Sequence, residues 1–188
     1  MSVLVILGSR NPAGQTARAA EALCAGLAEA HCPSERVFLP QLKLEQCRQC
    51  QDNGWGECLA QGTCVIQDGF SSLVGRIRAS KLIVFANPVY FGQLSESLRG
   101  FLDRLRRCCR NAAGKAGIEG KKAVGICVAG GGGGGAASCC LGLEQVLATC
   151  GLDVLDLVPV RRQNLEMKLE LLRLTGRWLA GQAVEAQA

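Results

Sequence analysis

The chain has 188 residues, 48% of them hydrophobic and 20% charged, with 12 cysteines and one histidine. This composition excludes a disordered or fibrous protein. No apolar run approaches the roughly 20 residues that a membrane span needs, and the net charge of +5 is too small to indicate nucleic-acid binding. The single His31 excludes metal sites that need two imidazoles. The N-terminal residues lack the basic and apolar regions of a signal peptide. We therefore expect a cytoplasmic protein, with no membrane and no nucleic acid among its partners.

Strand and helix patterns alternate along the chain. Strand patterns occur at residues 3–7, 35–40, 81–87, 122–129 and 152–160. Apolar residues at helical spacing predict helices over residues 16–30, 70–79, 94–109, 138–149 and 165–179. Residues 41–67 form a long irregular segment with four cysteines. Five strands separated by helices indicate a single α/β domain over residues 1–188, with a doubly wound parallel sheet covered on both faces.

Three unusual loops each follow a predicted strand: GSRNPAGQT at residues 8–16, NPVYFGQ at 87–93 and AGGGGGGA at 129–136. Ligands of such sheets bind beyond the carboxyl ends of the strands, where the strand order reverses. The first loop opens into a helix, so its backbone N–H groups and the positive helix end would hold a phosphate. It matches neither GxGxxG nor the Walker loop. The alternative for this loop is an ordinary turn with Thr16 as the helix cap.

The other two loops suit a flat ligand. Pro88 fixes the backbone and Gly92 permits a tight turn, while Tyr90 and Phe91 could line a planar heterocycle or merely cover the core. The six glycines at residues 130–135 let the backbone approach a ring closely, or they are simply flexible.

With their flanking residues, including NPVYFGQLSESLRGFLDR, these loops resemble the NADPH-dependent FMN reductase superfamily of flavodoxin-like proteins over nearly the whole chain. The resemblance implies the strand order 2-1-3-4-5 and a bound FMN. It assigns the phosphate to Ser9, Asn11, Gly14, Gln15 and Thr16, with Arg10 also among the cofactor-binding residues. It assigns the ribityl chain and the ring to Pro88, Val89, Tyr90, Phe91 and Gly92, with Ala129, Gly130, Gly131 and Gly132 closing over the ring.

The irregular segment carries Cys47, Cys50, Cys58 and Cys64 in CRQCQDNGWGECLAQGTC. At this place, after the second strand, it resembles the iron–sulfur flavoproteins of anaerobic microbes, which implies a [4Fe–4S] cluster held by these four cysteines. The spacing C-x2-C-x7-C-x5-C differs from the compact motif of that group, and Asn53 stands where the third cysteine would be. Zinc, a thiol–disulfide switch and structural thiols are the alternatives. We interpret the other eight cysteines as small hydrophobic residues.

The resemblance implies an FMN-dependent oxidoreductase that transfers electrons, with no catalytic side chain. NAD(P)H or a ferredoxin-like protein would be the donor, a small molecule the acceptor, and a homodimer or homotetramer the assembly. One alternative is an NAD(P)H-dependent FMN or quinone reductase without a cluster; another is a zinc- or thiol-based redox sensor or carrier. Residues 99–122 hold eight Lys and Arg against two acidic residues. This region is either a solvated helix end or a landing patch for an acidic partner or for NADPH phosphates.

Overall fold

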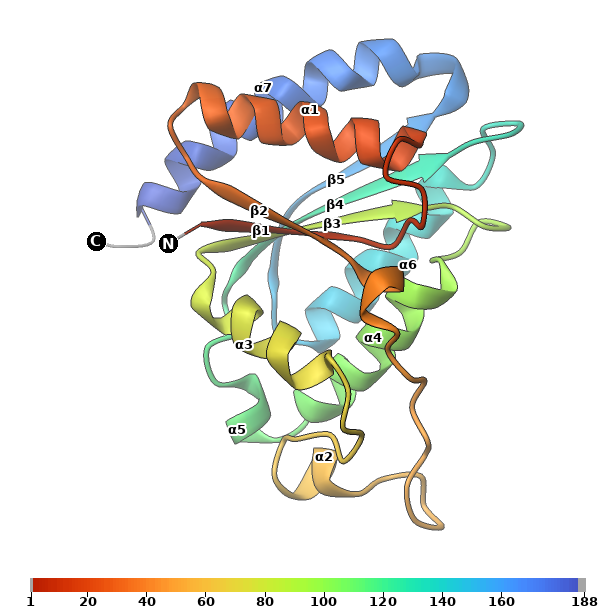
Figure 1. Cartoon of the computed structure of the whole chain (residues 1–188), viewed down its shortest axis with the longest axis vertical. Coiled ribbons are helices and arrows are strands. Elements are labelled where there is room, and N and C mark those ends of the chain that lie inside the picture. The colour runs from red at the N-terminus through yellow and green to blue at the C-terminus, as the bar shows by residue number, and fades with distance from the viewer. Residues whose placement is uncertain (1, 186–188) are drawn as a thin grey trace.

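The computed structural model describes residues 2–185 and shows one parallel sheet between two layers of helices (Figure 1). The strands are β1 (Val3–Leu7), β2 (Ser34–Phe38), β3 (Leu82–Pro88), β4 (Lys122–Ala129) and β5 (Asp153–Arg161). Neighbouring strands pair in parallel in the order β2-β1-β3-β4-β5. This order confirms the predicted doubly wound fold class.

Two helices cover one face of the sheet and three cover the other. The first layer consists of α1 (Gln15–Glu29) and α7 (Leu165–Glu185), and the second of α3 (Phe70–Ala79), α4 (Glu96–Cys108) and α6 (Ala136–Thr149). In β1, Val3 and Val5 pack under the first layer, whereas Leu4 and Ile6 pack under the second. Because successive strand side chains point to opposite faces, a strand buried on both sides needs an uninterrupted apolar run.

Short elements interrupt the connections. A 3-10 turn, η1 (Leu39–Leu42), follows β2, so the second strand ends earlier than predicted, before Pro40. The helix α2 (Glu57–Ala60) lies in the segment predicted as irregular, α5 (Ala112–Lys115) follows α4, and a second 3-10 turn, η2 (Arg162–Asn164), precedes α7. In Figure 1 the cysteine-rich segment with α2 lies at the lower end of the molecule, away from the carboxyl ends of the strands. Among the helices of residues 2–185, none has both the length and the apolar character needed to cross a membrane.

The first layer depends on a close contact between α1 and α7. A Cβ atom on Gly176 would lie 2.1 Å from the carbonyl oxygen of Leu23, so only glycine fits there. Beside this contact, Arg177 binds a carboxylate oxygen of Glu29 at 2.8 Å, and Arg173 binds the other oxygen. The inner face of α7 is therefore fixed against α1.

Candidate functional site

The three loops predicted to bind a ligand converge on one cavity of about 610 Å³. They follow β1, β3 and β4, which lie side by side, so their carboxyl ends share one edge of the sheet. The cavity is lined by Ser9, Gln15, Thr16, Pro88, Val89, Tyr90, Phe91, Val128, Ala129 and the glycines at residues 130–134. Its volume lies within the range of small-molecule sites.

The first loop presents uncapped backbone donors to this cavity. Asn11 accepts a hydrogen bond from the backbone N–H of Ala13 at 3.0 Å and shapes the turn. Gly14 is the N-cap of α1 and supplies no side-chain acceptor, so Thr16 is not the helix cap. The first N–H groups of a helix have no partner within it and favour an anion. Thr16 itself is buried at the cavity wall.

Gln15 provides the most direct test of whether a ligand fits. Its Oε1 atom is buried and has no hydrogen-bond partner. The atom lies beside the glycine loop, 3.8 Å from the position a Cβ on Gly130 would take. An unpaired buried amide oxygen costs about 1–3 kcal/mol. A ligand with hydroxyl or ring N–H donors, as FMN has, would satisfy this atom, so the cavity fits such a molecule.

The second loop is closed at its base and exposed at its tip. The buried Asn87 accepts a hydrogen bond from Ser95 N at 3.0 Å and donates one to the Pro88 carbonyl at 2.8 Å. Between Pro88 and Ser95, Tyr90 and Gln93 pair with each other and close a hairpin with a two-residue loop. Its central residues have positive φ, 50° at Phe91 and 75° at Gly92, a conformation that an aromatic residue rarely adopts. The hairpin therefore presents Phe91, which is fully exposed, as one of the residues that line the cavity.

The third loop is supported by a residue that the sequence did not reveal. Gln163, in η2 after β5, donates a hydrogen bond to the carbonyl of Gly132 at 2.9 Å. Within the loop, Gly133 N binds the carbonyl of Gly130 at 2.7 Å. β5 ends at the same edge of the sheet as β4, and this position is the only signal that could have indicated Gln163. The cavity residues Val128, Gly133 and Gly134 were also missed.

Most of the predicted cofactor residues meet at this cavity, but four do not line it. Asn11, Gly14 and Gly92 shape the surrounding turns instead. Arg10 lines a neighbouring cavity of about 350 Å³, on the side of η1 and the start of α4. Tyr90 is shared by the two cavities.

The four predicted metal ligands line one small pocket of about 20 Å³. These are Cys47, Cys50, Cys58 and Cys64. Over residues 2–185, no three His, Cys, Asp or Glu side chains lie close enough together to hold a metal ion. Four thiols are a donor set suited to iron or zinc, but here they share a pocket without converging on one point.

Cys108 from α4 is a fifth thiol in the same pocket and was not predicted there. Burial and then the nearby thiols of Cys64 and Cys58 raise the pKa of Cys108 to about 12, so this thiol is neutral. Five other cysteines are buried, in agreement with the interpretation as small hydrophobic residues: Cys109, Cys127, Cys139, Cys140 and Cys150. Cys24 and Cys32 are partly buried.

A buried ion pair joins the cysteine-rich segment to α4. Arg104 donates to both carboxylate oxygens of Asp68, at 2.6 and 2.9 Å, and to the carbonyl of Glu45 at 3.0 Å. It also stacks on Phe70, 4.2 Å from the ring centroid. Burial alone would raise the pKa of Asp68, but hydrogen bonds from Arg104 and from two backbone N–H groups lower it to about 2. The carboxylate is therefore ionised and fixes both ends of the segment.

Further contacts from the same basic region hold the middle of the segment. Arg107 donates to the carbonyl of Gly54 at 2.6 Å and lies 4.7 Å from the ring centroid of Trp55. Asn111 donates to two carbonyls at the end of α2, each at 3.0 Å. Part of the cationic region 99–122 thus has an internal structural role that neither sequence interpretation included.

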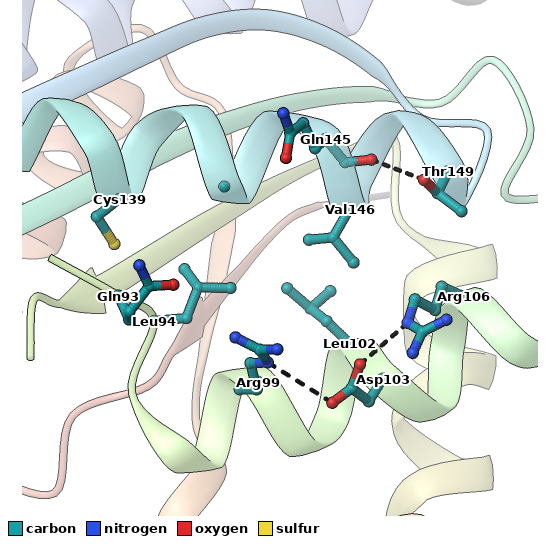
Figure 2. A pocket seen from close by; sticks show the side chains of 11 residues that line it. Gln93, Leu94, Arg99, Leu102, Asp103, Arg106, Cys139, Gln145, Val146 and Thr149 are labelled. Atoms are coloured by element: carbon teal, nitrogen blue, oxygen red, sulfur yellow. Dashed lines mark hydrogen bonds and ion pairs between the residues drawn. The ribbon is translucent and has the colours of Figure 1, made fainter.

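The groove between α4 and α6 forms another cavity, of about 410 Å³ (Figure 2). Asp103 lies on its α4 side between two arginines, 3.0 Å from Arg106 and 3.7 Å from Arg99. Leu94, Leu102 and Val146 give the groove apolar walls. Its cations are thus already paired with a carboxylate.

Comparisons with known proteins agree with this geometry. The model of the family described as NADPH-dependent FMN reductase matches residues 1–164. An iron–sulfur flavoprotein from Archaeoglobus fulgidus is 29% identical over 105 residues, which are 56% of this chain and 46% of that protein. An iron–sulfur flavoprotein from Methanocaldococcus jannaschii is 29% identical over 106 residues, which are 56% of this chain and 52% of that protein. The match thus spans about half the length of these curated relatives.

The solved structures support the fold. An NAD(P)H:quinone oxidoreductase from Methanothermobacter marburgensis superposes with a TM-score of 0.69 and 24% identity, over 95% of this chain and 96% of that one. A flavodoxin from the domain Archaea superposes with a TM-score of 0.62 and 12% identity, over 97% of this chain and 99% of that one, so the five-stranded sheet is flavodoxin-like. With the family model covering most of the sequence, the chain belongs to the NADPH-dependent FMN reductase family.

Proposed function

We propose that this chain is an FMN-dependent oxidoreductase whose cofactor occupies the cavity formed by the loops after β1, β3 and β4. The convergence of these three loops on one cavity of about 610 Å³ carries the proposal. The unpaired Oε1 of Gln15 and the uncapped start of α1 support it, because both need polar partners that the protein does not provide. The name of the family, and the names of the flavoprotein relatives, point to the same cofactor.

Each loop has a separate task in this proposal. The N–H groups at the start of α1, with Ser9 and Thr16, would bind the phosphate. Gln15 would accept a hydrogen bond from the ligand, while Tyr90 and Phe91 would cover one side of the ring. The glycine loop, held by Gln163, would bring backbone groups to the ring edge. The chemistry that FMN would supply when bound is hydride and electron transfer, and the protein would contribute binding and orientation.

We further propose that Cys47, Cys50, Cys58 and Cys64 bind a [4Fe–4S] cluster. Their shared pocket and the names of the two iron–sulfur flavoprotein relatives support this assignment. Arg104 and Arg107 also line the pocket, and their charges would offset the negative charge of a thiolate-bound cluster. In Figure 1 the cysteine-rich segment with α2 lies at the lower end of the molecule, whereas the loops after β1, β3 and β4 lie at the carboxyl ends of these strands.

The partners follow from the same proposal. We expect NAD(P)H or a ferredoxin-like protein as the electron donor and a small molecule such as a quinone as the acceptor. All twelve cysteines are free, which favours the reducing cytoplasm as the location.

The cofactor assignment is tested by fluorescence titration of FMN with two variants that keep the shape of the cavity. Thr16→Val and Gln15→Leu should each weaken FMN binding by about 1–3 kcal/mol, because each removes one hydrogen-bonding group. Thr149→Val is the matched control, since this hydroxyl bonds Gln145 at the far end of α6. Unchanged affinity in both variants would contradict the proposed cradle.

The reaction is tested with FMN-loaded protein under anaerobic conditions. Oxidation of NADPH or NADH with a quinone as acceptor should depend on added FMN and should fall in Thr16→Val at limiting FMN. If the FMN-loaded chain accepts electrons from neither NADPH nor NADH but is reduced by a ferredoxin, the electron donor is a ferredoxin-like protein. If no donor reduces the FMN-loaded protein, the assignment as an oxidoreductase is refuted.

The cluster is tested by metal analysis after anaerobic purification. About four iron atoms per chain are expected for a [4Fe–4S] cluster, and Cys50→Ser should lose them while retaining FMN. Cys32→Ser is the control, because Cys32 packs against the core on the other side of the sheet. Zinc in place of iron, or iron retained by Cys50→Ser, would contradict the ligand assignment without affecting the FMN proposal.

A further inference from the structure

The outer face of α7 carries an exposed apolar stripe, formed by Met167, Leu171, Leu174 and Trp178. Their exposed fractions are 59%, 38%, 54% and 47%. The successive spacings of four, three and four residues place these side chains along one face of the helix. Together they form a continuous apolar strip on the surface rather than isolated exposed residues.

The core of this chain does not account for the stripe. The inner face of α7 packs against α1 and the sheet through Leu165, Leu172 and Leu179, all of which are buried. The close contact at Gly176 fixes the rotation of α7, so the stripe cannot turn inward. In Figure 1, α7 lies with α1 in the outermost layer of the molecule.

The spacing is that of a helix–helix seam. Alternating steps of three and four residues are the a/d pattern of coiled coils, in which apolar side chains interlock with those of a second helix. We propose that the stripe on α7 binds the same stripe of a second copy of this chain, with the two helices antiparallel. Such a pairing is isologous, because the same patch serves on both subunits.

The charges beside the stripe favour the antiparallel arrangement. Pairing Leu171 with Leu174 of the partner subunit places Glu170 opposite the partner's Arg177. Glu170 has no ion-pair partner within the described part of the chain. The Arg177 side chain is 44% exposed and binds Glu29 through Nη1, which leaves other N–H groups of its guanidinium for a second carboxylate. A parallel pairing would instead set Glu170 near the partner's Thr175, with no charge complement.

The same register sets Met167 against Trp178 of the partner subunit. The seam from residue 167 to residue 178 is about 17 Å long at 1.5 Å per residue. An interface of this length, without other contacts, is below the roughly 1,000 Å² that stable complexes usually bury. The dimer should therefore dissociate reversibly on dilution.

Sedimentation velocity of the protein over a wide concentration range, with and without added FMN, tests the surface. The wild type should pass from monomer to dimer, and Leu174→Glu should raise the dissociation constant at least tenfold, about 1.4 kcal/mol. Leu141→Glu is the matched control, because Leu141 is a 60%-exposed leucine on α6, away from the stripe. A wild type that stays monomeric, or a control that dissociates as readily as Leu174→Glu, would overturn the proposal.

Glu170→Arg tests the register without touching the apolar stripe. It should weaken the dimer more than Glu170→Gln does, since it sets two cations against each other across the seam. Circular dichroism and FMN titration should show unchanged folding and cofactor binding in all these variants. The outcome is thus independent of the proposed function. Equal dimer affinity in Glu170→Arg and the wild type would refute the antiparallel register.

A benzophenone side chain in place of Trp178 tests the direction directly. Unlabelled and isotope-labelled protein are mixed, irradiated and digested with trypsin. The antiparallel dimer should then show residue 178 cross-linked to the partner's tryptic peptide of residues 163–168. Cross-links to the partner's residues 178–188 would show a parallel pair, and the absence of any intermolecular cross-link would remove α7 as the interface.

Discussion

Asp68→Asn is the most informative single change to the second helical layer. The substitution preserves the shape of the side chain and removes its charge. It leaves Arg104, whose side chain is only 1% exposed, facing a neutral amide. Breaking one partner of a buried ion pair costs about 3–5 kcal/mol. Because asparagine retains one acceptor oxygen, we expect a loss of about 3 kcal/mol in the free energy of unfolding at pH 7.

The pH dependence of that loss follows from the pKa of Asp68. The folded protein lowers this pKa from 3.8 to about 2, and each pKa unit corresponds to about 1.4 kcal/mol. The proton-linked part is therefore about 2 kcal/mol. Since the folded-state pKa is depressed, this stability is present above about pH 5 and is lost as the pH falls towards 2.

Urea denaturation of wild type and Asp68→Asn at several pH values measures the effect. The gap between them should be constant from pH 7 to about pH 5 and should narrow by about 1 kcal/mol at pH 3. Asp103→Asn is the control, because its carboxylate lies on the same helix α4 but pairs at the surface, where such pairs contribute below about 1 kcal/mol. A gap below 1 kcal/mol at pH 7, or one that widens in acid, would refute the reasoning.

Three further changes probe the helix contact and the loops. Gly176→Ala should destabilise by about 2 kcal/mol in urea, because the new methyl group meets the Leu23 carbonyl at 2.1 Å; an unchanged midpoint would disprove the close contact. Gly75→Ala, where a Cβ meets nothing within 4 Å in α3, should stabilise by about 0.5–1 kcal/mol, and a loss would contradict the open space there. Phe91→Gly should raise the melting temperature by relieving the positive φ, yet weaken FMN binding; tighter FMN binding would rule out a role for the ring.

The sheet could be predicted from the sequence because its signals are local. β1 and β4 are apolar at nearly every residue, and the glycine, proline and amide residues that interrupt the pattern mark the turns. Once parallel strands are inferred, their carboxyl ends must share an edge, so the three loops could be placed together before the structure was known.

The contacts that depend on distant pairs could not be predicted. Arg104 lies in a helix full of arginines, and nothing local indicates that it is the buried one; its partner Asp68 is 36 residues earlier in the chain. Gln163 reaches the glycine loop across 31 residues. Cys108 enters the cysteine pocket only because the irregular segment packs on α4. To predict each of these contacts, one must know which elements pack against each other, and the spacing of residues along the sequence does not contain this information.

The most direct measurement of the central claim is a calorimetric titration of the folded protein with FMN and, separately, with riboflavin. If the loops after β1, β3 and β4 hold one cofactor by its phosphate and its ring, FMN should bind one per chain, and riboflavin, which has no phosphate, should bind at least tenfold more weakly. FMN that does not bind, or riboflavin that binds equally well, would contradict the account.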